Sequence, residues 1–277
     1  MLKKKDLFIF DMDGVLYRTS EPIPSGIACV KKLRDLGKIV VFLTNNSSKT
    51  PENFAQKLYD MGLQVESELI YTSATITAMQ LSSQYRNAQV YVIGEHGLYQ
   101  ALKDQGFTVL NEIYPNIEDL TIIPEDLTAD LVVVGWDTHV NYNKFRVAMM
   151  LILKGAQFYA TNDDASFPAP GTFWPGSGAN VAFLSTALGK APEKIFGKPF
   201  PDGIQTILQH YHKDPDSAVL VGDRLSTDIL GGNHAKITTV FVETGINSHD
   251  DVSRVSEEQK PTYTFPLLSD MIDKYFS

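Results

Sequence analysis

Aspartates follow two short apolar runs of this 277-residue chain, at points where a buried strand would end. Asp11 and Asp13 come directly after Leu7–Phe10, and Asp223 follows a second run, with Asp228 five residues later. Carboxylates can bind a hard cation, attack an electrophile or exchange protons with a substrate. A single Asp-x-Asp pair is more often a turn or a helix cap, so the pattern needs support from other residues.

Further polar residues stand at comparable positions, after a third apolar run or in a connecting loop: Thr44, Asn45, Asn46 and Lys198. Thr44-Asn45-Asn46 alone is an ordinary cap and turn signal, and a lone Gly-Lys-Pro carries almost no information. Ligands of open α/β sheets bind beyond the carboxyl ends of the strands. Four such groups of polar residues, on strand ends and loops that one sheet could bring together, therefore indicate a functional site.

The predicted site carries an excess of negative charge. Its four aspartates would bring up to four negative charges and a phosphate dianion about two more, against one positive charge from Lys198. A divalent cation on oxygen ligands would resolve this imbalance, and Mg²⁺ typically takes one or two carboxylates, waters and a phosphate oxygen. The cation, Lys198 and the Thr44 hydroxyl would then stabilise a phosphoryl group during its transfer.

The elements that must position these residues alternate along the chain. Buried strands are predicted at Leu7–Phe10, Ile39–Leu43, Leu69–Tyr71, Val90–Ile93, Leu131–Val134, Phe158–Ala160, Ala218–Val221 and Thr239–Val242. Helical spacing is found at Gly26–Leu36, Pro51–Met61, Leu98–Gln105, Asn143–Lys154, Ala179–Leu188, Gly203–Gln209 and Thr227–Gly231. This alternation predicts an α/β protein with largely parallel sheets.

Four motifs resemble those of the haloacid dehalogenase (HAD) superfamily: Asp11-x-Asp13-Gly14-Val15, Thr44-Asn45-Asn46, Gly197-Lys198-Pro199 and Gly222-Asp223-x-x-x-Thr227-Asp228. The resemblance implies a Rossmann-like core and catalysis through an aspartyl phosphate. Asp11 would be the nucleophile. Asp13 would protonate the leaving group and later deprotonate the attacking water, which favours phosphatase or phosphomutase chemistry over dehalogenation.

The same resemblance assigns the remaining roles. Asp11, Asp223 and the backbone carbonyl of Asp13 would hold Mg²⁺, and Asp228 would orient the water shell of the metal. Thr44 and Lys198 would hold the phosphate, with Asn45 and Asn46 beside them as further substrate-binding candidates.

The spacing of the motifs predicts two domains. Lys198 lies 154 residues after Thr44, whereas Thr44 lies only 31 after Asp13. In the superfamily, an insertion at this place implies a class II cap, and its pattern resembles type A, the NagD-like and 4-nitrophenylphosphatase-like group. We expect a catalytic core at 1–79 and 180–277 and a substrate-selecting cap at 80–179. The Pro- and Gly-rich stretch 167–178 is interpreted as a loop at the border.

Composition excludes several other classes. The 24 Lys and Arg residues against 33 Asp and Glu give a net charge of −9, which argues against nucleic acid or an anionic membrane as partner. The longest apolar run, Val147–Leu153, is too short for a spanning helix. Cys29 is the one cysteine, which rules out an intrachain disulfide and, with the short apolar start of the chain, favours a cytoplasmic protein.

These observations favour an Mg²⁺-dependent phosphatase of small phosphorylated metabolites. Sugar phosphates, phosphoglycolate, glycerol phosphate, pyridoxal phosphate and nucleoside monophosphates remain open as substrates. Type A caps imply a homodimer through the cap. A phosphotransferase or mutase using the same aspartyl phosphate is the first alternative, and a non-catalytic module with a phosphorylated Asp11 is the second. A dinucleotide-binding dehydrogenase is excluded, because no Gly-x-Gly-x-x-Gly follows a strand.

Three aromatic residues near the predicted border leave two interpretations open. Trp136, Phe173 and Trp174 either face the mouth of the active site and select the leaving group, or pack between elements.

Overall fold

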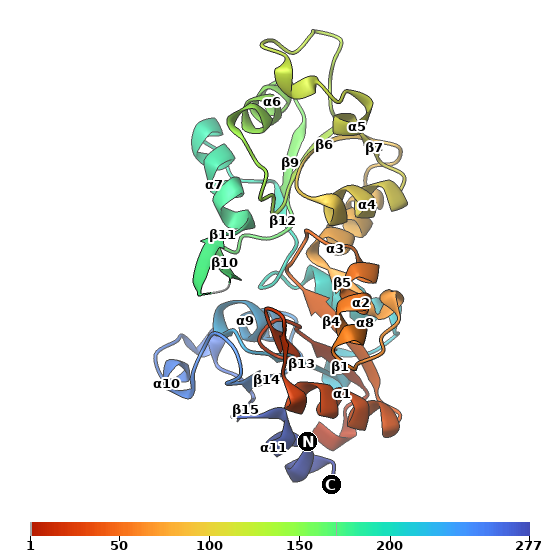
Figure 1. Ribbon diagram of the computed structural model, residues 1–277, viewed down its shortest axis with the longest axis vertical. Helices are drawn as coiled ribbons and strands as arrows, with labels where there is room; N and C mark the ends of the chain where they lie inside the picture. The colour runs from red at the N-terminus through yellow and green to blue at the C-terminus, as the bar shows by residue number, and fades with distance from the viewer. Residues whose placement is uncertain (1, 170) are drawn as a thin grey trace. The chain divides into compact units, whose positions relative to one another are not determined.

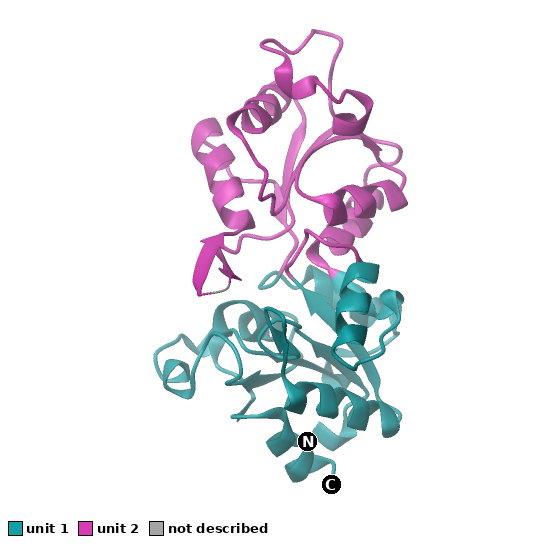
Figure 2. Cartoon of the chain, in the orientation of Figure 1, with its two compact units in different colours: residues 1–44, 51–71, 198–277 teal, residues 45–50, 72–197 magenta. Residues whose placement is uncertain are grey.

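The computed structural model describes residues 2–169 and 171–277 (Figure 1). The chain forms two compact units, drawn in different colours in Figure 2. Residues 1–44, 51–71 and 198–277 make up the first unit, and residues 45–50 and 72–197 make up the second. Each unit has its own sheet with helices, so the fold is α/β with a second α/β unit inserted into the first in sequence.

The sheet of the first unit has the strand order β15-β14-β13-β1-β4-β5. Its strands are β1 (Leu7–Phe10), β4 (Ile39–Thr44), β5 (Ile70–Thr72), β13 (Ala218–Gly222), β14 (Thr238–Val242) and β15 (Tyr263–Phe265). β1 pairs in parallel with both β13 and β4, and all four of its residues are buried. Such an uninterrupted apolar strand is typical of a parallel sheet that is covered on both faces.

Helices and short turns surround this sheet: α1 (Pro24–Asp35), α2 (Pro51–Asp60), α8 (Asp202–His210), a π-helical turn (Leu225–Ile229), α9 (Leu230–His234), α10 (His249–Val252) and α11 (Leu268–Tyr275). A small antiparallel hairpin of β2 (Tyr17–Arg18) and β3 (Glu21–Pro22) follows β1. Phe8, Phe10 and Phe42 lie in the main hydrophobic core of the unit. This core fixes the strand whose carboxyl end carries Asp11.

The second unit has a five-stranded sheet in the order β12-β9-β8-β6-β7, with parallel pairing throughout. Its strands are β6 (Gln89–Ile93), β7 (Thr108–Val109), β8 (Leu131–Val134), β9 (Gln157–Ala160) and β12 (Lys194–Ile195). Its helices are α3 (Ser73–Ser82), α4 (His96–Asp104), α5 (Leu110–Ile113), α6 (Tyr142–Leu153) and α7 (Ser177–Leu188). Apolar residues of β6, β8, β9, α6 and α7 share one core.

The eight predicted strands are all present, with ends that differ by at most one residue. The interpretation of 167–178 as a loop was wrong, because β10 (Ser166–Ala169) and β11 (Thr172–Pro175) form an antiparallel hairpin there. Pro168 and Pro175 lower the strand signal, but an isolated two-stranded ribbon has edges on which a missing N–H is tolerated. The hairpin is not a border, since it belongs wholly to the second unit.

The units meet in sequence at different places from the expected borders. The second unit begins its long segment at Thr72 and ends at Gly197, whereas borders at 79/80 and 179/180 would cut through α3 and α7. α3 escapes detection because its apolar residues lack amphipathic spacing. Its start is instead fixed by a capping box, in which Thr72 accepts from the backbone of Thr75.

The helices of residues 2–169 and 171–277 include none with the length and apolar character needed to cross a membrane.

Candidate active site

Three neighbouring strands of the first unit end in the polar residues of the predicted site. Asp11 directly follows β1, Thr44 is the last residue of β4, and Asp223 directly follows β13. The backbone N–H of Asp11 donates to the carbonyl of Val221 at 2.9 Å, which continues the β1–β13 ladder as far as Asp11. Because these strands are parallel, their carboxyl ends lie at the same edge of the sheet.

Lys198 joins this edge from a distant part of the sequence. Its ammonium Nζ lies 2.5 Å from Asp11 Oδ1 and 2.7 Å from Asp228 Oδ1, and donates to the carbonyl of Leu43 at 3.0 Å. The residue is only 3% exposed. Two carboxylates and a carbonyl hold this buried ammonium in a fixed position, which suits it to bind an anionic group.

Asp11, Asp223 and Asp228 form a buried group of carboxylates, with one oxygen of each within 4.8 Å of the others. Asp223 Oδ2 accepts from the backbone N–H of Ile246 at 2.7 Å. Oδ1 of Asp228 is buried and lies 2.7 Å from the ammonium of Lys198, and Asp228 Oδ2 accepts from the backbone N–H of Arg224 at 3.0 Å. A buried group of three carboxylates that shares one ammonium is a suitable site for a hard divalent cation.

Glycines leave the space in which Asp223 sits. A Cβ at Gly245 would lie 1.8 Å from Asp223 Oδ2, and a Cβ at Gly14 would lie 2.4 Å from the carboxyl carbon Cγ of Asp223. Gly14 also has φ +83°, a conformation that residues with a side chain rarely adopt. Glycine at position 14 is therefore required by the backbone turn and by the close approach of Asp223.

The electrostatics of the group agree with an unbalanced negative charge. Burial, and to a smaller extent Asp228 and Asp223, raise the pKa of Asp11 well above its usual value against the opposing effect of Lys198. Burial and Asp228 raise the pKa of Asp223 to about 7. Burial lowers the pKa of Lys198, but Asp11 and Asp228 outweigh it and raise that pKa overall. One ammonium does not balance three carboxylates, so the arrangement favours an additional cation.

Asp13 is partly exposed on the turn that follows β1, and its charge contributes to raising the pKa of Asp223. Burial raises the pKa of Asp13 itself, while the positive charge of Lys57 and the backbone N–H of Thr19 act in the opposite direction. A raised pKa keeps a carboxyl group protonated closer to neutrality, as a general acid needs. Lys57 was not found from the sequence, where it has the spacing of an ordinary surface lysine on α2.

The remaining predicted residues are divided between the units. Thr44 is buried in the first unit, at the edge that carries Asp11. Asn45 and Asn46 belong to the second unit. Asn45 Nδ2 donates to Asp164 Oδ2 at 2.7 Å, and Asn46 Oδ1 accepts from the backbone N–H of Ser48 at 2.9 Å. Their contact with substrate stays a prediction.

The second unit holds another acidic group, Glu95, Asp137 and His139. Protein donors already serve its two carboxylates. Lys144 Nζ lies 2.8 Å from Asp137 Oδ2, and both the N–H and the hydroxyl of Thr138 donate to Glu95 Oε1. This network fixes the loop after β8 without a further ion.

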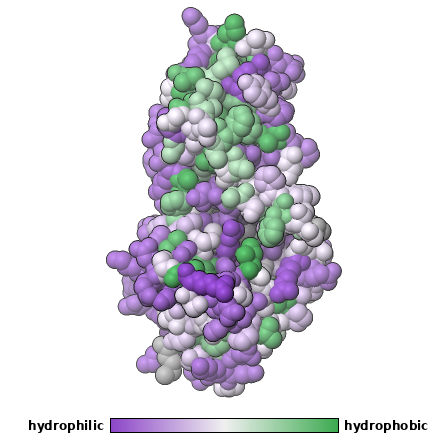
Figure 3. Space-filling model, turned by 90° about the vertical axis from the view of Figure 1, so that its left-hand side faces the viewer, coloured by the Kyte–Doolittle hydropathy of each residue, from purple (hydrophilic) through white to green (hydrophobic). Residues whose placement is uncertain are grey.

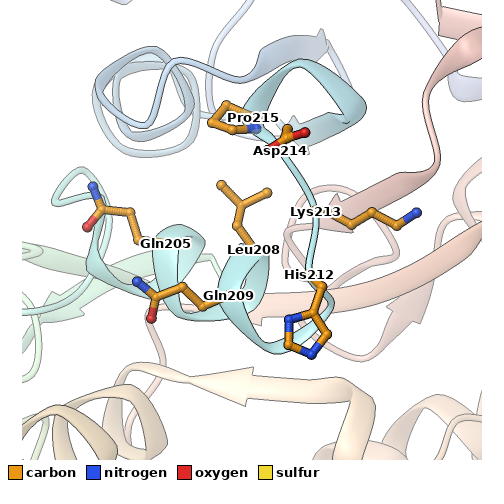
Figure 4. Close-up of a pocket in the computed structure, with 7 residues that line it drawn as sticks. All are labelled: Gln205, Leu208, Gln209, His212, Lys213, Asp214 and Pro215. Carbon is orange, nitrogen blue, oxygen red and sulfur yellow. The ribbon is translucent and has the colours of Figure 1, made fainter.

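A cavity of about 560 Å³ lies beside the end of α8 (Figure 4). It is lined by Gln205, Leu208, Gln209, His212, Lys213, Asp214 and Pro215. The last of these residues precede the amino end of β13, whereas Asp223 follows its carboxyl end. The cavity is therefore separate from the carboxylate site.

The aromatic residues near the hairpin have different surroundings. Trp136 stacks on Phe167 with ring centroids 4.3 Å apart, and its Nε1 donates to the carbonyl of Pro175 at 2.9 Å. Phe173 and Trp174 are 63% and 49% exposed. Packing within the second unit accounts for Trp136, whereas the two residues of β11 are accessible to a ligand or partner.

Comparison with known proteins gives a consistent set of similarities. Residues 8–108 match the family described as haloacid dehalogenase-like hydrolase, and residues 195–271 match one described as HAD-hydrolase-like. The chain is 34% identical over 268 residues to an acid sugar phosphatase of Staphylococcus epidermidis, covering 97% of each chain.

Two solved structures extend these similarities to the fold. A p-nitrophenyl phosphatase from Archaeoglobus fulgidus superposes with a TM-score of 0.87 at 30% identity, covering 98% of this chain and 99% of that one. A glycerol phosphate phosphatase from Mycobacterium tuberculosis, solved in complex with magnesium, gives a TM-score of 0.86 at 28% identity, covering 98% of this chain and 77% of that one.

Proposed function

The chain belongs to the haloacid dehalogenase superfamily, in its NagD-like subfamily IIA, and is a phosphatase; on this premise we propose that it hydrolyses small phosphomonoesters through an aspartyl phosphate on Asp11, with Mg²⁺ as cofactor. The observation that carries the proposal is the buried group of Asp11, Asp223 and Asp228 around the Lys198 ammonium. It combines a candidate nucleophile, a cation and buried carboxylate oxygens at one edge of the sheet.

Asp11 is the nucleophile in this account. One of its carboxylate oxygens forms a bond to phosphorus while the ester P–O bond breaks, and Asp13 gives its proton to the departing oxygen. Asp13, now ionised, then takes a proton from the water that attacks phosphorus, and the bond to Asp11 breaks. Lys198 and Thr44 hold the phosphoryl oxygens through both steps, which require the same arrangement of charge.

The carboxylate group fits the metal that the family implies. Asp11, Asp223 and the backbone carbonyl of Asp13 would hold Mg²⁺, with Asp228 orienting its waters. When bound, the cation supplies positive charge that offsets the carboxylates and the phosphoryl oxygens. The raised pKa values of Asp11 and Asp223 support the proposal, because burial, with a smaller contribution from Asp228, makes their ionised forms costly and a bound cation would offset that cost.

A small phosphorylated metabolite is the substrate class that we propose. The second unit would act as a type A cap, which favours a compact ester over a phosphoprotein. The names of similar proteins refer to sugar phosphate, nitrophenyl phosphate and glycerol phosphate, which are all small phosphomonoesters and so support this class of substrate. The net charge of −9 argues against nucleic acid.

We also propose a homodimer through the second unit. α7 carries no charged residue along its whole length, and Ala182, Phe183, Thr186 and Ala187 are exposed on it. Figure 3 shows hydrophobic residues gathered on the face of the second unit that carries this helix. An exposed helix face without charged residues is suited to burial in an interface, and a second copy offers the same surface for an isologous contact.

Phosphate release from a panel of phosphomonoesters tests the proposed activity. The panel contains sugar phosphates, phosphoglycolate, glycerol phosphate, pyridoxal phosphate and nucleoside monophosphates, assayed with and without Mg²⁺ on the wild type and Asp11→Asn. We expect release that depends on Mg²⁺ and is absent in the variant. Release by Asp11→Asn at the rate of the wild type would contradict the mechanism. Assays with an added alcohol acceptor distinguish hydrolysis from transfer, since a phosphotransferase yields a new ester instead of phosphate.

A further inference from the structure

We propose that Lys57 on α2 is a positioning residue for Asp13: its ammonium, stacked on the ring of Tyr17, holds the turn that carries Asp13 in the orientation that protonates the leaving group. This inference deepens the function proposed above and rests on it, because it concerns Asp13 as general acid.

The turn after β1 is closed by the backbone of Tyr17. The N–H of Gly14 donates to the carbonyl of Tyr17 at 2.7 Å, and the N–H of Leu16 donates to the carbonyl of Met12 at 2.8 Å. Asp13 and Tyr17 also form an isolated β-bridge. The direction of the Asp13 side chain therefore depends on where Tyr17 is held.

Lys57 holds Tyr17 from a separate element. Its Nζ lies 3.4 Å from the centroid of the Tyr17 ring, and the ring is only 2% exposed. A cation over the face of a desolvated aromatic ring is attracted by the ring quadrupole. Burial, and the nearby carboxylates of Asp13 and Asp11, raise the pKa of Tyr17 well above its usual value, so the ring stays neutral beside them.

α2 is a firm support for this contact. Phe54 and Leu58, on the same helix as Lys57, are 2% and 0% exposed in the core of the first unit. Phe54 lies three positions before Lys57 and Leu58 one position after it, so the helix cannot shift without disturbing that core. Lys57 itself is half-buried, unlike the exposed Lys31 on α1.

One electrostatic effect and one hydrogen bond act on Asp13 in this turn. The charge of Lys57 acts on Asp13, whose pKa it lowers against the larger, opposite effect of burial. Thr19 donates its backbone N–H to Asp13 and has φ +54°, an uncommon conformation for a β-branched residue. Strained backbone of this kind persists only where neighbouring structure holds it.

Dependence on the leaving group separates positioning of a general acid from other roles. p-Nitrophenolate departs without a proton, whereas an alkoxide does not, so only alkyl esters need Asp13 in the first step. We would measure kcat/KM, which reports that step, for p-nitrophenyl phosphate and glycerol phosphate. In Lys57→Met, we expect kcat/KM to fall about tenfold or more for glycerol phosphate and less than about threefold for p-nitrophenyl phosphate.

Matched variants complete the experiment. Lys57→Arg keeps a cation that stacks on aromatic rings, so it should retain most of the wild-type kcat/KM for glycerol phosphate. Lys31→Met makes the same change at an exposed site of another helix and should leave both values unchanged. Where Lys57→Met proves unstable, Tyr17→Leu removes the other partner of the contact and should show the same bias against glycerol phosphate. An equal loss for both esters, or no loss, would overturn the inference.

Asp13→Asn distinguishes failure of this inference from failure of the function on which it rests. It should show a stronger bias against glycerol phosphate than Lys57→Met does. A bias in Asp13→Asn without one in Lys57→Met rejects only the role of Lys57. No bias in Asp13→Asn rejects Asp13 as general acid, and the role of Lys57 with it.

Discussion

The ammonium of Lys198 lies 2.5 Å from the carboxylate of Asp11, and the two residues are 187 positions apart in the sequence. The inserted second unit accounts for most of this separation. After the inserted unit, the chain thus continues at the same edge of the sheet. Lys198, the proposed phosphate-binding cation, therefore lies against Asp11, the proposed nucleophile.

Removal of the Lys198 ammonium should impair binding and turnover together. The cation would act on the phosphoryl oxygens in the ground state and in the transition state alike, so Lys198→Ala should raise KM and lower kcat, with kcat/KM reduced roughly 100-fold or more. Steady-state kinetics check this. Lys213→Ala is the control, because it removes a partly exposed lysine that pairs with Asp6 at 3.1 Å. Unchanged kcat and KM in Lys198→Ala would exclude the role.

Mg²⁺ should stabilise the protein more at high pH than at low pH. The pKa of Asp223 is about 7 in the folded chain, against an ordinary value of 3.8, chiefly because of burial. Between these values the folded state binds the additional proton, so this group makes the free energy of unfolding of the metal-free protein fall as pH rises. A cation requires the ionised carboxylate, and its binding therefore strengthens as pH rises through about 7.

Thermal unfolding with and without Mg²⁺ measures this dependence. We expect a larger increase in Tm on adding Mg²⁺ at about pH 8.5 than at about pH 5.5. Asp223→Asn should remove most of the Mg²⁺-induced increase in Tm at both pH values. An increase that is independent of pH in the wild type would show that the carboxylates of the site are not the ligands.

Gly245→Ala should weaken metal binding without unfolding the protein. Its Cβ would lie 1.8 Å from Asp223 Oδ2, so the carboxylate must move away from the site. We expect the Mg²⁺ concentration for half-maximal activity to rise about tenfold or more. Gly37→Ala is the control, since it meets nothing within 4 Å and strains only a backbone with φ +72°. Equal Mg²⁺ requirements in both variants would contradict the arrangement around Asp223.

Phe183→Asp should dissociate the proposed dimer. Phe183 stacks on Phe145 with centroids 4.0 Å apart, yet its side chain is 44% exposed on the uncharged surface of α7. A carboxylate there would be buried without a partner in the interface. Sedimentation velocity should show a dimer for the wild type and a monomer for the variant. Tyr59→Asp changes an exposed aromatic residue of α2 and should remain dimeric. A monomeric wild type would rule the dimer out.

Much of the candidate site was accessible from the sequence because parallel strands align their carboxyl ends. Asp11, Thr44 and Asp223 were placed together by that rule alone, and the structure has them on three neighbouring strands. Lys198 could be assigned only through its motif, because it lies outside any strand. The family and the α/β fold with an inserted unit are likewise confirmed.

Other features depend on contacts that local sequence does not encode. The expected borders near 80 and 179 cut through helices, because α3 starts at a threonine capping box and has no amphipathic pattern. The hairpin at 166–175 was hidden by its prolines. The contact of Lys57 with Tyr17 joins a surface-type lysine to a residue 40 positions earlier, so only the folded chain shows it.

The most direct test of the central claim is detection of the phosphorylated residue. Protein is mixed with Mg²⁺ and p-nitrophenyl phosphate, whose leaving group needs no proton, quenched in acid within milliseconds, digested and examined by mass spectrometry. Asp13→Asn is used to slow hydrolysis of the intermediate. We expect one phosphoryl group on the peptide that contains Asp11, absent when Asp11→Asn is added to the same chain. Substrate turnover by the wild type with no phosphorylated Asp11 at any time, or with the phosphoryl group on another residue, would contradict the account.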